Sequence, residues 1–80
     1  MKHNLSDKAK NRLQKIEINQ RERITKKIKF YIEQDNPLLF AKTLGNGFYR
    51  FRVGDYRVIF YIDEDIIQIV DVNRRDKIYK

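Results

Sequence analysis

The sequence predicts an α+β fold in which an N-terminal antiparallel helix pair packs on an antiparallel sheet of three to four strands. Apolar residues recur every three or four positions in the first part of the chain, and they alternate with polar residues in the second half. The glycines at 45 and 47 mark the change of period. The 80 residues contain no repeat or linker, so we expect one domain over residues 1–80.

Two helices are predicted in the first part of the chain. Ser6 and Asp7 are typical of a helix N-terminus, and the apolar stripe that follows them consists of Ala9, Leu13 and Ile16. A second helix is predicted over residues 21–34, with Arg and Lys outside and with an inward stripe of Ile24, Ile28, Tyr31 and Ile32. Asn36-Pro37 ends this helix, because the residue before a proline disfavours the α region.

Three antiparallel strands are predicted after the glycine turn, over residues 48–53, 56–62 and 66–72, and residues 1–4 are expected to add a short edge strand. Gly54-Asp55 suits a two-residue type II′ turn, which sets Arg52 opposite Arg57 and Arg50 opposite Ile59. One face of this hairpin then carries Tyr49, Phe51, Val53, Val58 and Phe60 toward the helices. The other face carries Arg50, Arg52, Arg57, Ile59 and Tyr61.

The charge of the chain limits the classes of partner. Lys and Arg total 18 against 11 Asp and Glu, which gives a net charge of +7 and a pI of about 9.8. This charge favours a polyanionic partner, either nucleic acid or an acidic protein. The absence of cysteine excludes disulfides and thiolate metal sites, and no apolar run is long enough to span a membrane. We expect a cytoplasmic protein with no cofactor and no membrane association.

The three arginines of the hairpin form a surface that folding alone would not favour. Like charges that face each other across strands destabilise a sheet by roughly a few tenths to 1 kcal/mol. One interpretation is that the side chains of Arg52 and Arg57 spread into water at little cost. The other is an anion site on the sheet, because guanidinium groups bind phosphate in a bidentate manner.

The C-terminal segment VDVNRRDKIYK adds basic residues directly after the last predicted strand. Alone, it is as consistent with a solvated tail as with a binding site. Beside the hairpin arginines it predicts a continuous basic surface, with Tyr61 and Tyr79 available to stack on bases. The residues expected to bind nucleic acid on this surface are Arg74, Lys77, Lys80 and Tyr61.

No metal site is expected. Asp63, Glu64 and Asp65 form an acidic turn without the ligand spacing of a calcium loop, and a solvated loop is the simpler interpretation. His3 lies near the N-terminus, far in sequence from the arginines.

The stretch LGNGFYRFRVGDYRVIFYI, followed by NRRDKIY, resembles the RelE/ParE superfamily of bacterial toxins. The resemblance covers nearly the whole chain, and YRFRVGDYRVIFYID is its most specific part. It implies a helical hairpin on an antiparallel sheet. In this superfamily RelE-like members cut messenger RNA in the ribosomal decoding site, ParE-like members poison DNA gyrase, and both are neutralised by an antitoxin.

The resemblance also implies catalytic residues. The family's basic positions in the strand before the turn match Arg50 and Arg52, and the arginine of its YR motif matches Arg57. Its C-terminal arginine and tyrosine match Arg75 and Tyr79.

Arg74 is an alternative to Arg75, because spacing in the C-terminal segment varies. Two features of the chain differ from the family pattern, and one is a shortened opening strand. RelE-type members commonly have lysines where this chain has Arg50 and Arg52.

The implied function is that of the toxin of a type II toxin–antitoxin system, a ribosome-dependent mRNA endoribonuclease that inhibits translation. Its reaction would be metal-independent attack of an RNA 2′-hydroxyl on the adjacent phosphate. Arginine stays protonated in proteins, so the base is either Tyr79, whose pKa the surrounding cations would lower, or a group of the RNA or ribosome.

Two alternatives to the nuclease remain: a ParE-like DNA gyrase inhibitor, and a catalytically degenerate member that only binds its antitoxin. The expected partners are the ribosome with mRNA and a cognate antitoxin, with a heterotetramer as one arrangement of the toxin–antitoxin complex.

Overall fold

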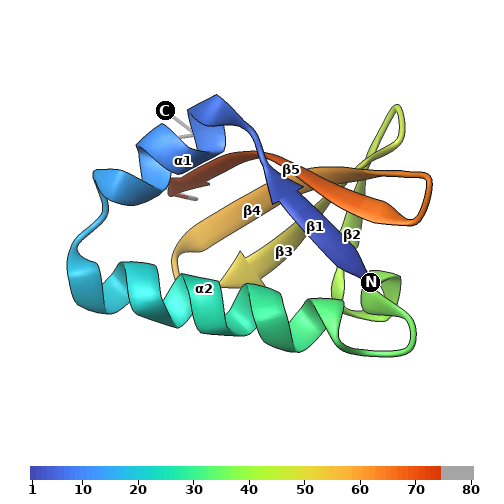
Figure 1. The fold of residues 1–80 in the computed structure, drawn as a ribbon, viewed down its shortest axis with the longest axis horizontal. Coiled ribbons are helices and arrows are strands. Elements are labelled where there is room, and N and C mark those ends of the chain that lie inside the picture. Colours follow the sequence, from blue (N-terminus) through green and yellow to red (C-terminus); the bar gives the residue numbers. More distant parts are fainter. Residues whose placement is uncertain (75–80) are drawn as a thin grey trace.

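Residues 1–74 form a five-stranded sheet with two α-helices on one side (Figure 1). The computed structural model describes residues 1–74. In chain order the elements are β1 (Lys2–Leu5), α1 (Asp7–Gln14), α2 (Ile18–Ile32), the 3₁₀ helix η1 (Pro37–Phe40), β2 (Lys42–Gly45), β3 (Phe48–Val53), β4 (Tyr56–Asp63) and β5 (Ile66–Arg74). The strand order across the sheet is β1-β5-β4-β3-β2.

Helix α1 begins where the sequence predicts. The Ser6 hydroxyl accepts a hydrogen bond from the Ala9 N–H at 3.1 Å, which satisfies one of the unpaired donors of the first turn. The same hydroxyl donates to the Val70 carbonyl oxygen at 3.0 Å. One side chain therefore both caps α1 and fastens it to β5.

Helix α2 is longer at its N-terminus than the apolar pattern predicts. It starts at Ile18 because the Glu17 carboxylate accepts hydrogen bonds from the N–H groups of Asn19 and Gln20. A charged cap of this kind also suits the positive end of the helix dipole. The helix ends at Ile32, and the Asn36 side chain then caps η1, with Pro37 in its first turn.

The hairpin of β3 and β4 has the predicted register. Arg52 pairs with Arg57, and Arg50 pairs with Ile59. Gly54 has a φ of 59° and the φ of Asp55 is negative, as a type II′ turn requires. The second hairpin turn, Glu64-Asp65, places two non-glycine residues at φ 50° and 65°.

The sheet has more strands than the predicted three to four. The four-residue strand β2 pairs antiparallel with β3, with a register shift between Thr43 and Gly45. The N-terminal residues do form an edge strand, but β1 runs parallel to β5, so the sheet is not wholly antiparallel. The α+β architecture with a helix pair on a sheet is confirmed, and α1 and α2 run in opposite directions (Figure 1).

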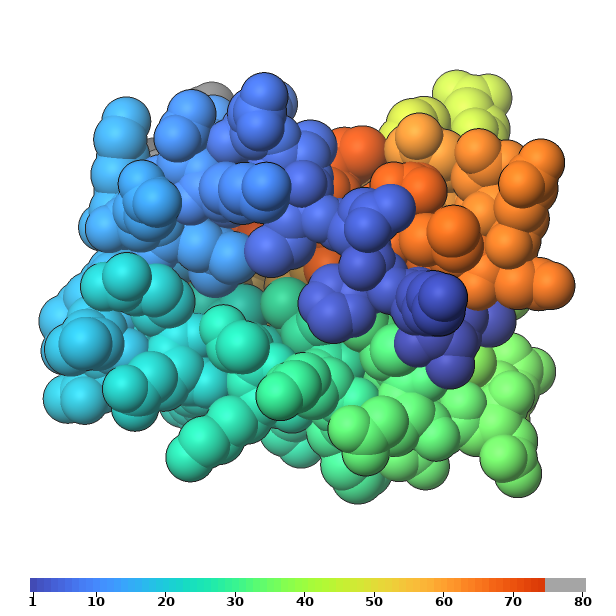
Figure 2. All heavy atoms as spheres, viewed as in Figure 1, coloured from blue at the N-terminus to red at the C-terminus, as the bar shows by residue number. Residues whose placement is uncertain are grey.

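The core lies between the helices and the inner face of the sheet. Phe51 and Phe60 are fully buried, and their stacked rings have centroids 4.4 Å apart. Tyr31 of α2 stacks on Phe51 with centroids 4.7 Å apart, which joins the helix to the sheet. Helix α1 packs on β5, and atoms of α1, α2 and β1 cover most of the face seen in Figure 2. The other buried apolar residues among residues 1–74 are Ala9, Leu13, Ile24, Ile28, Ile32, Pro37, Val53, Val58, Ile67, Ile69 and Val72.

Two phenylalanines of β3 give a matched test of this packing. Phe51→Ala should lower the free energy of unfolding by about 3–5 kcal/mol, because it removes a fully buried ring from the stack. Phe48→Ala, at a ring that is 37% exposed on the opposite face, should cost about 1 kcal/mol or less. Urea unfolding followed by circular dichroism measures both, and equal losses would contradict the assignment of the two faces.

Candidate nucleic-acid interface

The outer face of the sheet, turned away from the helices, carries two rows of side chains. The strand registers align Lys42, Arg50, Ile59 and Asp71 across four strands. The neighbouring row consists of Arg52, Arg57 and Asn73. The three arginines predicted to share one face do share it, and we call these two rows the basic face.

The arginines of the basic face are not neutralised by carboxylates of the described chain. Arg52 is exposed, and Arg50 and Arg57 are half-buried. Within residues 1–74, the two ion pairs found join Lys8 and Arg12 of α1 to Asp71. The positive charges of β3 and β4 therefore remain available to an anion.

Asp71 is the one carboxylate in the two rows, and other groups engage it. Its Oδ2 lies 3.6 Å from Lys8 Nζ and its Oδ1 lies 3.8 Å from Arg12 Nε. It also accepts hydrogen bonds from the Val72 N–H at 2.9 Å and from Asn73 Nδ2 at 3.0 Å. Since α1 supplies these cations, the helix compensates a negative charge that would otherwise weaken the basic face.

Two polar atoms of the second row are buried and form no hydrogen bond with any described residue, namely the donor Arg57 Nε and the acceptor Asn73 Oδ1. Leaving a buried donor or acceptor unpaired costs about 1–3 kcal/mol. Arg52 facing Arg57 adds a like-charge contact beside them. Both features oppose folding, so the second row has the properties of a site retained for binding.

An aromatic pair borders the arginines. Phe48 and Tyr61 are 37% and 36% exposed, and their rings meet edge to face with centroids 5.7 Å apart. Exposed aromatic rings beside cations are suited to stacking on nucleic-acid bases. Tyr61, predicted to bind RNA, thus lies on the same face as Arg57 and Ile59, with which it shares strand parity.

Lys42 is a member of the basic face that the sequence pattern did not reveal. It pairs with Arg50 at the edge of the sheet, on a strand of four exposed residues. The available signal was the turn Gly45-Asn46-Gly47, which implies a strand on each side of it.

The predicted C-terminal residues are placed only in part. Arg74 ends β5 opposite Tyr56, at the parity of the inner face, with its Cζ 6.0 Å from the centroid of the Tyr56 ring. It therefore does not join the two rows. Arg75, Lys77, Tyr79 and Lys80 lie outside the described residues, so their roles stay predictions.

Two further observations concern other classes of site. The part of the chain described, residues 1–74, contains no cluster of three or more His, Cys, Asp or Glu side chains able to hold a metal ion. No helix within these residues is long and apolar enough to cross a membrane.

Because Arg52 faces Arg57, removing the charge of Arg52 should stabilise the fold even if that charge is needed for binding. Arg52→Gln should raise the free energy of unfolding by a few tenths to about 1 kcal/mol at low ionic strength, because it removes the charge that faces Arg57. The gain should shrink as salt is added, since salt screens exposed charges. Lys29→Gln, an exposed charge on α2, is the control. A loss of stability for Arg52→Gln at low salt would contradict the repulsion.

Comparison with known proteins places the chain in a family. The family model described as the ParE toxin of the type II toxin–antitoxin system parDE matches residues 4–79. No curated protein matches the sequence.

Three solved structures have the same fold. The RelBE2 toxin–antitoxin complex of Mycobacterium tuberculosis matches with 22% identity and a TM-score of 0.81, over 92% of this chain and 96% of that one. The RelB–RelE complex of Methanococcus jannaschii matches with 25% identity and a TM-score of 0.73, over 94% and 93%. The Escherichia coli RelBE complex matches with 14% identity and a TM-score of 0.74, over 91% and 94%. From the family match over nearly its whole length, together with this shared fold, the chain belongs to the ParE toxin family of type II toxin–antitoxin systems, within the RelE/ParE superfamily.

Proposed function

We propose that this toxin is a ribosome-dependent endoribonuclease that cuts mRNA and thereby inhibits translation. The observation that carries the proposal is the basic face: Arg50, Arg52 and Arg57 lie on adjacent strands with no ion pair among the described residues. Guanidinium groups fixed on a sheet match the geometry of a phosphodiester. The toxin would act in the cytoplasm, where ribosomes translate.

The proposed reaction needs no cofactor or metal. The 2′-hydroxyl of one nucleotide attacks the adjacent phosphorus and loses its proton to a base, and the bond to the 5′-oxygen of the next nucleotide breaks. A general acid protonates the leaving 5′-oxygen, so the products are a cyclic phosphate and a 5′-hydroxyl. Negative charge builds on the phosphate oxygens at the transition state, which is where positive groups contribute most.

Each residue has a separate part in this scheme. Arg52 and Arg57, paired across the hairpin, stabilise the charge on the phosphate oxygens, and Arg50 holds the backbone nearby. Arginine remains protonated, so the base is Tyr79 or a group of the RNA or ribosome. Arg75 would assist the leaving group by its charge.

A second candidate function is inhibition of DNA gyrase. The observation that favours it is the family match, because the matching model describes ParE toxins. A gyrase inhibitor would use the same surface to bind a protein and would break no phosphodiester bond. A member that has lost activity and only binds its antitoxin would do neither.

A cognate antitoxin is the second proposed partner. The solved structures of similar fold are complexes of a toxin with its antitoxin. Phe48 and Tyr61 offer an acidic, amphipathic antitoxin segment apolar burial beside positive charges. Such a segment would cover the arginines and so neutralise the toxin by occlusion, and two copies of each chain would give a heterotetramer.

Brief induction in bacteria, followed by mapping of mRNA 5′ ends, tests the nuclease. The unmodified toxin should produce breaks within translated codons. Arg57→Ala should lower the cleavage rate by about 100-fold to 1000-fold, the usual loss when one stabilising donor is removed from a transition state. Lys29→Ala, which removes one exposed charge from α2, should cleave normally.

Other outcomes separate the alternatives. Intact messages with a DNA-damage response would indicate gyrase inhibition. Intact messages without that response would indicate a member that only binds its antitoxin. Full cleavage by folded Arg57→Ala would remove this residue from the mechanism.

The antitoxin surface has its own test. Phe48→Ser with Tyr61→Ser should weaken binding of the antitoxin about tenfold or more, because loss of roughly 1.4 kcal/mol or more is typical of exposed aromatic anchors. Titration calorimetry with the purified antitoxin measures the affinity. Phe30→Ser, at an exposed ring on α2, is the control. Equal effects of the control and the double variant would contradict the assignment.

A further inference from the structure

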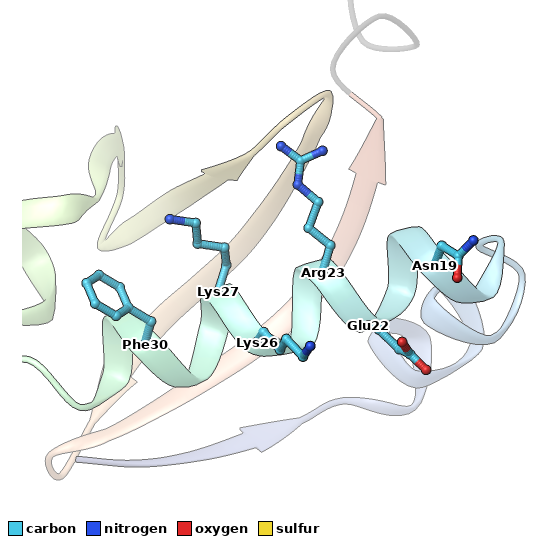
Figure 3. A pocket seen from close by; sticks show the side chains of 6 residues that line it. All are labelled: Asn19, Glu22, Arg23, Lys26, Lys27 and Phe30. Carbon is cyan, nitrogen blue, oxygen red and sulfur yellow. The ribbon is translucent and has the colours of Figure 1, made fainter.

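Helix α2 carries a second ordered stripe besides its buried one. Ile24, Ile28 and Ile32 face the core at intervals of four residues. On another side of the helix, the side chains that line a groove of about 470 Å³ are Asn19, Glu22, Arg23, Lys26, Lys27 and Phe30 (Figure 3). Arg23, Lys27 and Phe30 follow the spacing i, i+4, i+7 that places side chains on one helix face, and Lys26 lies beside that face. We call this surface the α2 groove.

The α2 groove is strongly basic. It has three cations, Arg23, Lys26 and Lys27, against the single carboxylate of Glu22. None of these four side chains belongs to an ion pair within residues 1–74. Figure 3 shows Arg23 and Lys27 extending from one side of α2 while Lys26 leaves the helix in another direction. The positive charge is thus spread along the groove, as contact with several phosphates requires.

One of the cations is held in place by neighbouring rings. Lys27 Nζ lies 5.4 Å from the centroid of Phe30 and 5.6 Å from that of Tyr31, within the range of a cation–π contact. The guanidinium of Arg23 lies close to Gly54 of the hairpin turn, and both residues line one hollow. Held side chains lose less conformational entropy when a ligand binds them.

The contact of Arg23 with Gly54 also connects the α2 groove to the basic face. Gly54 lies in the turn between Arg52 and Arg57. The Tyr31 hydroxyl of α2 donates to the Arg52 carbonyl oxygen at 3.4 Å, so the helix and the end of β3 also touch there. The α2 groove and the basic face therefore lie on the two sides of the hairpin tip, where the Asp55 carboxylate is the one acidic group of the turn.

We propose that the α2 groove binds the sugar–phosphate backbone of RNA, as a second contact for an RNA that also occupies the basic face. The choice of RNA among polyanions rests on the proposed nuclease function. An acidic protein segment fits less well, because Phe30 is the one apolar side chain in the groove and a protein helix gains most of its affinity from apolar burial. Phosphate contacts need charge alone, and Phe30, which is 49% exposed, is available to stack on a base.

The salt dependence of RNA binding tests the proposal. The parent protein is the full chain with Arg57→Ala, a change that keeps any residual cleavage of the RNA slow during the titration. Lys26→Gln with Lys27→Gln in this parent removes two charges from the groove, and Lys10→Gln with Lys29→Gln removes two exposed charges elsewhere. Fluorescence anisotropy of a labelled RNA stem-loop, over a series of KCl concentrations, gives the slope of log K against log salt.

The groove pair should reduce the magnitude of this slope by about 1.4–1.8, since each phosphate contact contributes roughly 0.7–0.9. The control pair should leave the slope of the parent unchanged, and matching thermal midpoints confirm that all variants are folded. Equal slopes for the two pairs would overturn the proposal, because only net charge would then matter. The proposal would also be overturned if Lys26→Gln with Lys27→Gln weakened antitoxin binding while its slope for RNA matched that of the control pair.

This test is separate from that of the nuclease. If the unmodified toxin cuts no mRNA in cells but the groove pair still lowers the slope, the RNA contact of α2 stands and the endonuclease assignment fails. If mRNA is cut and the slopes are equal, the assignment stands and the α2 contact is wrong.

Discussion

The register of one hairpin governs the arrangement of charge in this protein. Gly54 adopts a positive φ that starts a two-residue turn, and the turn leaves Arg52 no neighbour across the ladder except Arg57. A shift by one residue would move the arginines into the core and the buried rings of Phe51 and Phe60 into water. The apolar stack therefore holds like charges together, because its burial is worth more than their repulsion costs.

The helices contribute to this surface although they lie on the other side of the sheet. Helix α1 supplies the cations that engage Asp71, and Ser6 fastens the start of α1 to β5. Helix α2 supports β3 through Tyr31, whose ring stacks on Phe51 and whose hydroxyl bonds to the backbone of Arg52. Through these contacts, the packing of the two helices determines the positions of charged groups on the basic face.

The hairpin between Phe48 and Asp63 could be predicted from the sequence, because the residues of its turn and the alternation of apolar and polar residues indicate the same register. It failed at β2, because four exposed residues with a register shift leave no alternation to detect. The parallel pairing of β1 could not be predicted, since no local signal distinguishes an edge strand beside β5 from one beside β3. The α2 groove was missed because charged positions on a helix are usually only solvated, and the contact of Arg23 with Gly54 exists only in three dimensions.

The parallel pairing of β1 with β5 has a consequence for biosynthesis. Residues 2–5 are synthesised well before their partners in the sheet, residues 66–69. Closing so long a loop is entropically unfavourable until most of the chain can pack. An interrupted translation product that ends before β5 lacks the strand that completes the core, so the folded form of this toxin can appear only after β5 has been made.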